Sequence, residues 1–171
     1  MRHGVCPWSR MALHTHLALL LTLVALGLAP GVAHLLELPV KLGYPPALYA
    51  EVTSTLYRWY GIVGGGIQVA AVLVALGFAA RVRRSHRAGL AGASAVALLV
   101  SLALWASLVA PANAEWSEVV RAGSERLVAA YVASRSRWEY GHVAAFIAWL
   151  VGWFGFVTLA TRPSSGQSGG V

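Results

Sequence analysis

The chain has 171 residues, of which 58% are hydrophobic and only 11% are charged, and its formal net charge is +7. This composition excludes an ordinary water-soluble domain, in which about a quarter of the residues are charged. Because the charges avoid four long apolar stretches, the excess of arginine indicates membrane topology, and nucleic acid is not an expected partner.

An amino-terminal cytoplasmic arm, residues 1–16, precedes the first apolar stretch, residues 17–36. This stretch has close to the roughly 20 residues that a helix needs to cross a bilayer, and Pro30-Gly31 predicts a kink in it. The same segment also resembles a secretory signal peptide, and cleavage after Ala33 would leave three crossings. We favour a retained helix, because the apolar sequence continues to Leu38.

Residues 39–60 are too polar to cross a bilayer and too apolar to form a free linker. Pro45-Pro46 ends one segment, and residues 47–60 are expected to form a helix that continues into the second crossing, residues 61–80. Interfacial aromatic side chains are typical membrane anchors, and a role in substrate binding or proton transfer is the open alternative. The polar and aromatic residues here are Tyr49, Glu51, Tyr57, Arg58, Trp59 and Tyr60.

The third and fourth crossings are expected at residues 90–110 and 143–160, and the outer segment between them, residues 111–137, is expected to be mostly helical. The Ser/Gly-rich end of the chain predicts a disordered cytoplasmic tail over residues 161–171. Cys6 is the only cysteine, which excludes a disulfide framework and a thiolate metal site within the chain.

Arginine placement predicts which side of the membrane each segment faces. The link at residues 81–87 carries four arginines and no acid, Arg2, Arg10 and Arg162 flank the crossings on the same side, and all six acids lie on the other side. The positive-inside rule makes the arginine-rich side cytoplasmic. The sequence therefore predicts an all-α, multi-pass protein of the cell membrane, of the bacterial inner type, with a four-helix transmembrane domain over residues 17–160 and both termini cytoplasmic.

Small residues four positions apart predict close helix packing, because van der Waals contact holds helices together in lipid. Gly61 and Gly65 form such a step in the second crossing, and Ala148 and Gly152 form one in the fourth. One compact four-helix bundle is expected.

Two mirrored motifs carry the strongest functional signal. His34-Leu-Leu-Glu37 closes the first crossing and Glu139-Tyr-Gly-His142 opens the fourth, so both lie at the extracytoplasmic face. Ionisable side chains near lipid are costly and are usually paired or functional. Three arrangements remain open: purely structural hydrogen-bonded pairs, one Zn, Fe or Mn ion held by these side chains, and a metal-free site with a histidine as general base and Arg137 or Tyr57 stabilising an anion.

Four segments also carry a family resemblance: His34-Leu-Leu-Glu37-Leu-Pro39-Val-Lys41, Tyr57-Arg58-Trp59, Pro111-Ala-Asn113 and Arg137-Trp138-Glu139-Tyr140-Gly-His142. With these motifs, residues 15–160 resemble the anthrone oxygenase-like family of small bacterial membrane proteins, best known as a domain of unknown function. The resemblance implies four transmembrane helices. It also implies a link to fungal enzymes that add oxygen to anthrones, which are flat aromatic polyketide intermediates, without an obvious prosthetic group.

The chemistry that the resemblance implies requires a base. An anthrone is acidic next to its carbonyl, so deprotonation gives a carbanion that reacts directly with dioxygen, and a membrane pocket dissolves the substrate and excludes water. Either histidine is a candidate base, oriented by its neighbouring glutamate. The expected catalytic residues are His34, Glu37, Glu139, His142, Arg137 and Tyr57, and the expected substrate-binding residues are Trp59, Tyr60, Asn113, Trp138 and Tyr140.

Two classes of function therefore stay open. The first is an oxygenase or other oxidoreductase that acts on a lipophilic small molecule, either without a cofactor or with one metal ion. The second is a non-enzymatic membrane protein whose paired histidines and glutamates bind a metal or fix helix packing. Residues 61–80 and 90–110 contain no charge, so we favour a site near the outer surface over a conducting path. The lipid bilayer is the expected partner, and the oligomeric state stays open.

Overall fold

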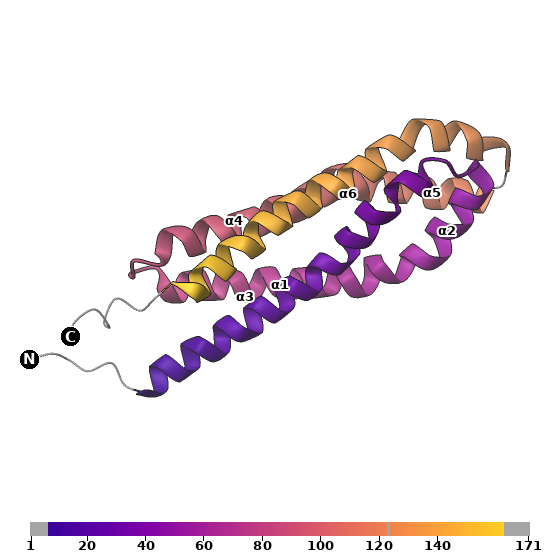
Figure 1. The fold of residues 1–171 in the computed structure, drawn as a ribbon. Helices are drawn as coiled ribbons and strands as arrows, with labels where there is room; N and C mark the ends of the chain where they lie inside the picture. The colour runs from indigo at the N-terminus through magenta and orange to yellow at the C-terminus, as the bar shows by residue number, and fades with distance from the viewer. Residues whose placement is uncertain (1–6, 123, 163–171) are drawn as a thin grey trace, which may run out of the picture.

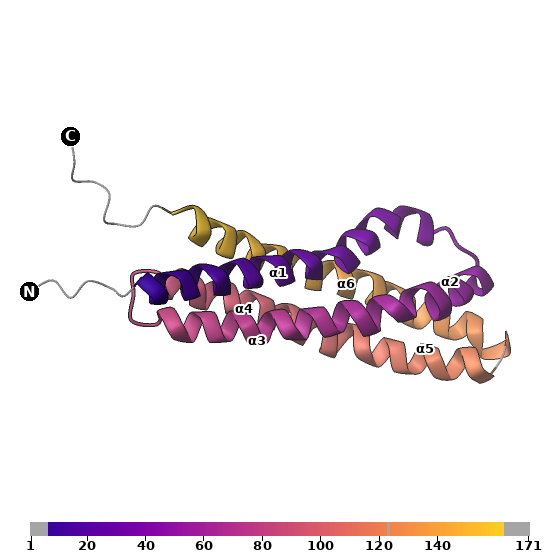
Figure 2. The ribbon, with the colours of Figure 1, turned by 90° about the horizontal axis from the view of Figure 1, so that it is seen from below.

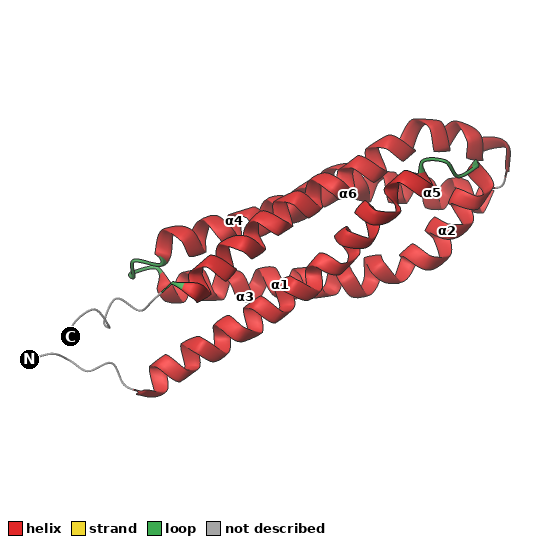
Figure 3. Ribbon diagram, viewed as in Figure 1, coloured by secondary structure: helices red, strands yellow, loops and turns green. Residues whose placement is uncertain are grey.

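The computed structural model describes residues 7–122 and 124–162, and every element in this part of the chain is a helix. Figure 1 shows long helical rods that lie side by side, and Figure 3 shows how little loop connects them. The predicted all-α fold class is confirmed. The elements are α1 (Pro7–Lys41), α2 (Pro46–Trp59), η1 (Tyr60–Gly64), α3 (Gly65–Val82), α4 (Ala88–Leu104), η2 (Trp105–Val109), α5 (Ala110–Ala122) and α6 (Ser124–Thr161), with η1 and η2 being short π-helical segments.

The helices form four rods, because α2, η1 and α3 continue into one another, as do α4, η2 and α5. Each rod is long and apolar enough to cross a membrane, which confirms the predicted four-helix membrane architecture. The helix expected over residues 47–60 does continue into the second crossing. The candidate spans are Met11–Lys41, Pro46–Val82, Ala88–Arg121 and Leu127–Thr161.

The four rods form a ring. α1 and α4 each pack against both α3 and α6. The start of α1, the link between α3 and α4 and the end of α6 lie at one end of the bundle, whereas α2 and α5 lie at the other (Figure 1, Figure 2). We call the second end the outer end, following the topology that the arginines predict.

The first helix is longer at both ends than the predicted crossing. α1 begins at Pro7, so part of the predicted arm is helical, because a proline in the first turn requires no intrahelical hydrogen bond. The helix runs through Pro30 and Pro39 to Lys41, and Figure 2 shows that its second half changes direction. Cys6 and tail residues 163–171 lie outside the described residues.

Glycines allow the closest approaches between the rods. A Cβ atom at Gly152 would lie 2.6 Å from Leu98 of α4, which confirms this predicted packing step. The step predicted at Gly61 and Gly65 is wrong, because a Cβ atom at either position would meet no described atom of another segment within 4 Å. Both glycines instead line a cavity, and the contact with α1 is made by Gly64.

The bundle is packed differently at its two ends. The inner half contains an apolar core, whereas the outer half is built around aromatic side chains. The inner core includes Leu20, Val24, Phe78, Leu98 and Phe156, all with an exposed fraction of 0%, and the outer cluster comprises Tyr49, Tyr57, Val109, Ala112, Tyr131 and Trp138.

Candidate functional site

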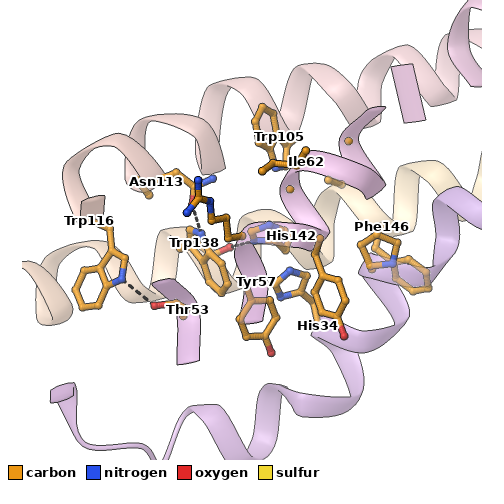
Figure 4. A pocket seen from close by; sticks show the side chains of 18 of the residues that line it. His34, Thr53, Tyr57, Ile62, Trp105, Asn113, Trp116, Trp138, His142 and Phe146 are labelled. Carbon is orange, nitrogen blue, oxygen red and sulfur yellow. Dashed lines mark hydrogen bonds between the residues drawn. The ribbon is translucent and has the colours of Figure 1, made fainter. Parts of the chain in front are cut away.

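A cavity of about 970 Å³ opens among the four rods in the outer half of the bundle. Its volume lies at the upper end of the range of about 300–1,000 Å³ that is usual for small-molecule sites. Figure 4 shows that side chains from all four rods converge on it. The lining includes His34, Tyr49, Thr53, Tyr57, Tyr60, Asn113, Trp116, Arg135, Trp138 and His142.

A buried lysine organises the charged groups beside this cavity. Lys41 Nζ lies 2.9 Å from Glu139 Oε2 and 3.1 Å from His34 Nδ1. Lys41 and Glu139 are each only 1% exposed, and the Tyr49 hydroxyl donates a hydrogen bond of 3.1 Å to Glu139 Oε1. A buried charge requires a partner of opposite sign, and this network supplies one to both the ammonium and the carboxylate.

Aromatic rings surround the same ammonium. Lys41 Nζ lies 4.7 Å from the centroid of the Tyr57 ring and 5.1 Å from that of Trp138, and both distances are typical of cation–π contacts. Tyr57 also stacks on His34 with 4.8 Å between the ring centroids. The rings therefore separate the ion pair from the lipid and position the imidazole.

The two histidines of the mirrored motifs are stacked on each other. Their ring centroids are 3.9 Å apart and the ring planes differ by 23°. His34 comes from α1 and His142 from α6 (Figure 4). The two motifs therefore come together, as expected, through their histidines. Trp138 closes the stack edge-on, with centroid distances of 5.0 Å to His34 and 4.4 Å to His142.

The hydrogen bonds assign different tautomers to the two neutral imidazoles. An ammonium group can only donate, so His34 Nδ1 accepts from Lys41 and the remaining proton of His34 is on Nε2. His142 Nδ1 lies 2.9 Å from the Trp138 carbonyl oxygen, which can only accept, so Nδ1 of His142 carries the proton. One histidine thus offers an N–H group at Nε2, and the other offers a lone pair at Nε2.

Hydrogen bonds also fix the tryptophans of the cavity wall. The Trp138 indole N–H donates to Asn113 Oδ1 over 2.6 Å, and the Trp116 indole N–H donates to Thr53 Oγ1 over 2.8 Å. These bonds join α6 to α5 and α5 to α2, and Figure 4 draws both. The wall is therefore built from rings whose orientation is set by polar partners.

Arg135 ties the turn between α1 and α2 to α6. Its guanidinium donates to the Leu42 carbonyl over 2.9 Å and to the Tyr131 hydroxyl, and that hydroxyl donates to the Tyr44 carbonyl over 2.6 Å. Arg135 also lines the cavity. The arginine that reaches the site from α6 is thus Arg135.

The carboxylate–histidine pairs expected within each motif do not form among the described residues. Glu139 is used by Lys41 and Tyr49, and His142 bonds to the backbone of its own helix. Glu37 is not among the cavity-lining residues, and its Oε2 is buried without a hydrogen-bond partner in the described part of the chain. Lys41 is the reason, because its ammonium donates to Nδ1 of His34 and forms the ion pair with Glu139.

Three further predicted site residues lie away from the cavity. Arg137 is about half exposed and pairs with Glu115 at 3.3 Å, while Trp59 is 64% and Tyr140 is 56% exposed. On α6 the buried face carries Trp138 and His142, four residues apart, so neighbouring positions 137 and 140 point elsewhere. Tyr57, Tyr60, Asn113 and Trp138 do line the cavity, and their expected roles in catalysis and substrate binding stay predictions.

The metal-ion arrangement does not fit this geometry. Among the residues that the structure describes, no group of three or more His, Cys, Asp or Glu side chains is placed to hold an ion. The positive charge between His34 and Glu139 is the ammonium of Lys41. We therefore derive no chemistry through a metal.

Sequence reasoning missed Lys41, Arg135 and the Thr53–Trp116 pair as site residues. Lys41 follows His34 by seven residues, which places both on one face of α1 two turns apart, so helical spacing was a usable signal. Trp116 comes from α5, and helical spacing carries no information on which residue of another rod it meets.

Comparisons of the chain with protein-family models, curated proteins and solved structures found no match. The resemblance to the anthrone oxygenase-like family accordingly stays a prediction.

Proposed function

We propose that the protein is a membrane enzyme that removes a proton from a lipophilic, weakly acidic aromatic molecule in this cavity and so prepares it for reaction with dioxygen. The observation that carries this proposal is the histidine stack, in which His34 offers an N–H group and His142 offers a lone pair on the wall of one cavity. A base and a hydrogen-bond donor side by side are what proton abstraction next to a carbonyl requires.

The two histidines then have separate roles. His142 Nε2 takes the proton of the acidic C–H bond, and its Nδ1–H bond to the Trp138 carbonyl holds the ring in the required tautomer. The electron pair of the broken C–H bond delocalises onto the carbonyl oxygen of the substrate. There the Nε2–H group of His34 stabilises the negative charge. This division favours His142 as the base, a choice that the sequence leaves open.

Lys41 makes the Nε2–H group of His34 a stronger hydrogen-bond donor. Its ammonium donates to Nδ1 of His34, and hydrogen bonds in a chain polarise one another, so the N–H group on the far side of the ring becomes a better donor. Glu139 balances the charge of Lys41 within the bundle. The described residues that line the cavity include neither Lys41 nor Glu139, so Lys41 acts through His34 and Glu139 acts through its contact with Lys41.

The oxygenation step balances without a cofactor. The carbanion bonds to dioxygen to form a peroxide, the peroxide takes up a proton, and loss of water leaves a second carbonyl. A CH₂ group and one O₂ therefore give a C=O group and one H₂O. The aromatic wall, with Tyr57 and Trp138, suits a flat substrate, because aromatic rings stack and pack edge-on.

The test is oxygen uptake with anthrone by protein purified into lipid nanodiscs, with empty nanodiscs subtracting spontaneous oxidation. Loss of a general base typically costs about 10²–10⁴-fold, so His142→Ala should lower the rate at least about 100-fold. The matched control is His14→Ala, since His14 is an exposed histidine near the other end of α1. Uptake by His142→Ala equal to that of the parent protein would rule out the proposed mechanism.

A non-enzymatic role is the second candidate, and one observation favours it. The Lys41–Glu139 pair is buried, lies off the cavity wall and joins α1 to α6, as a group that fixes helix register would do. Under this alternative the parent protein gives no oxygen uptake above empty nanodiscs, and the changes at His142 and His14 have the same effect.

A further inference from the structure

The cavity changes character along its length. Polar side chains of α2 and α5 line its outer mouth, among them Ser54, Arg58 and Arg121. Beyond the histidine stack most residues of the wall are small, apolar or aromatic, and they come from all four rods. This inner arm is lined by Gly27, Pro30, Gly61, Ile62, Gly65, Leu102, Trp105, Phe146 and Trp149.

Polar side chains in the inner arm are bound to the helix backbone. The Gln68 amide donates to the Gly27 carbonyl over 2.9 Å, and the Ser101 hydroxyl donates to the Ala145 carbonyl over 2.7 Å. The Trp149 indole N–H likewise donates to the Val24 carbonyl. Because these polar groups are already hydrogen-bonded, the surface of the inner arm is mainly apolar. Such a surface suits a hydrocarbon chain better than a polar group.

Two glycines keep the inner arm open. Gly61 and Gly65 are four residues apart and therefore share one helix face, and both line the cavity. A Cβ atom at either position would point into space free of described atoms for 4 Å. A larger side chain at Gly65 would therefore take up space beside the cavity wall without meeting a neighbouring segment.

Some residues of the inner arm, on the side of η1, α3 and η2, are also exposed on the outside of the bundle. Ile62 and Val69 line the cavity and are 55% and 51% exposed, and Trp105 of η2 lines it with 36% exposed. All three belong to rods long and apolar enough to cross the membrane, where exposed apolar surface faces hydrocarbon. Ile62 and Trp105 are both drawn in Figure 4. Both residues lie in π-helical segments, which are frequent at functional sites.

We infer that the ligand is an aromatic molecule with a long apolar chain: the aromatic head lies at the histidine stack, and the chain occupies the inner arm and enters from lipid between η1 and η2. The identity of the head rests on the proposed function, whereas the course of the chain rests on the lining of the inner arm. The substrate class is therefore a membrane lipid with an acidic aromatic head, and a compact aromatic taken up from water is the rival.

The test uses a photoreactive probe, 2-naphthol carrying a twelve-carbon chain with a terminal diazirine, bound to the protein in nanodiscs. After irradiation, mass spectrometry locates the label. The expected label lies on the inner arm, around residues 61–69 and 102–105, and excess anthrone should reduce it. Gly65→Leu should lower labelling of the arm about tenfold, because the leucine side chain would compete with the apolar chain of the probe for space beside Gly65.

Gly66→Leu is the matched control. Gly66 neighbours Gly65 and also has open space at its Cβ position, yet it does not line the cavity, so labelling should stay at the level of the parent protein. A label confined to lipid-facing residues such as Leu73 and Phe154, or one that Gly65→Leu leaves unchanged, would overturn the inference.

The labelling experiment tests the chain site and the oxygen-uptake experiment tests the reaction, so either proposal can fail while the other holds. A label on the lipid-facing surface together with His142-dependent uptake of oxygen would reject the chain site and retain the proposed reaction. A label in the arm without any oxygen uptake would reject the reaction and retain a site for a chain-bearing aromatic molecule.

Discussion

Lys41 links three parts of the site that come from different rods. Its ammonium contacts His34 on its own helix, Glu139 on α6 and the ring of Tyr57 on α2. The Lys41 ammonium and the Glu139 carboxylate would each be costly to bury alone, since an unpaired charge in an apolar interior is strongly unfavourable. The ion pair therefore allows a carboxylate and a polarised imidazole to exist within the bundle.

Lys41→Met should destabilise the bundle. It leaves the carboxylate of Glu139 buried without its cation, and breaking one side of a buried pair typically costs about 3–5 kcal/mol. The measurement is thermal unfolding in mild detergent.

The double change Lys41→Met with Glu139→Gln supplies the control, because it removes both charges. Most of the lost stability should return, since the amide oxygen of the introduced glutamine can still accept from the Tyr49 hydroxyl. A single variant as stable as the parent protein would show that the ion pair contributes little.

At the residue scale, the sequence predicts which groups meet but not how they pair. Helical spacing and the shared membrane surface bring His34 and His142 to one place. The partner of each group depends on depth and rotation of neighbouring rods, which is why Glu139 bonds to Lys41 and Tyr49 and not to His142. The sequence predicts Arg137 at the site, but the rotation of α6 brings Arg135 to the cavity and leaves Arg137 on the outside with Glu115.

At the scale of the elements, α6 contacts helices of all three other rods. It packs against α1, α4 and α5, and it supplies Arg135, Trp138 and His142 to the site. Toward the inner end, its glycines allow α4 to approach closely, as at Gly152. The same helix thus fixes the bundle in one half and the cavity wall in the other.

Gly152→Ala should separate α4 from α6. The added Cβ atom would lie 2.6 Å from Leu98 Cδ2 and 3.0 Å from the Ser94 carbonyl oxygen, and overpacking of this kind typically costs about 1–3 kcal/mol. The melting temperature in detergent should fall. Gly92→Ala provides the comparison, because a Cβ atom at Gly92 meets no described atom of another segment within 4 Å and the melting temperature should not fall. Equal melting temperatures for the two variants would contradict this account of the interface.

Hydropathy and proline positions predict the four crossings and the helix over residues 47–60, because apolar length and chain breaks are local properties. The glycine step at Gly61 and Gly65 shows the limit of that reasoning. A small-xxx-small pattern identifies a helix face without bulk, but it does not distinguish contact with another helix from a cavity wall. Here the face is empty and the neighbouring Gly64 makes the contact.

At the scale of the whole molecule, the apolar core and the cavity occupy different ends of the bundle. The inner half packs apolar side chains such as Leu20, Phe78 and Leu98 with no exposed surface. The outer half contains the cavity and the buried charges. A closely packed inner half holds the rods in place, which allows the outer half to keep an open space among the same rods.

The arginines should place the cavity on the extracytoplasmic side. The link between α3 and α4 carries Arg81, Arg83, Arg84 and Arg87, and loops rich in arginine stay in the cytoplasm. In a protein with Cys6→Ser, a membrane-impermeant maleimide added to spheroplasts should label Ser136→Cys near the outer end of α6. It should label Ser85→Cys, in the arginine-rich link, only after the membrane is opened.

Both serines are exposed in the structure, so differences in labelling report the side of the membrane and not burial. The opposite pattern would place the cavity on the cytoplasmic side. Replacing the four arginines of the link with glutamine should weaken the preference, because the positive charge near the crossings sets the orientation. A cavity on the extracytoplasmic side would receive a lipid-dissolved ligand from the outer leaflet, since the histidine stack lies in the outer half of the bundle.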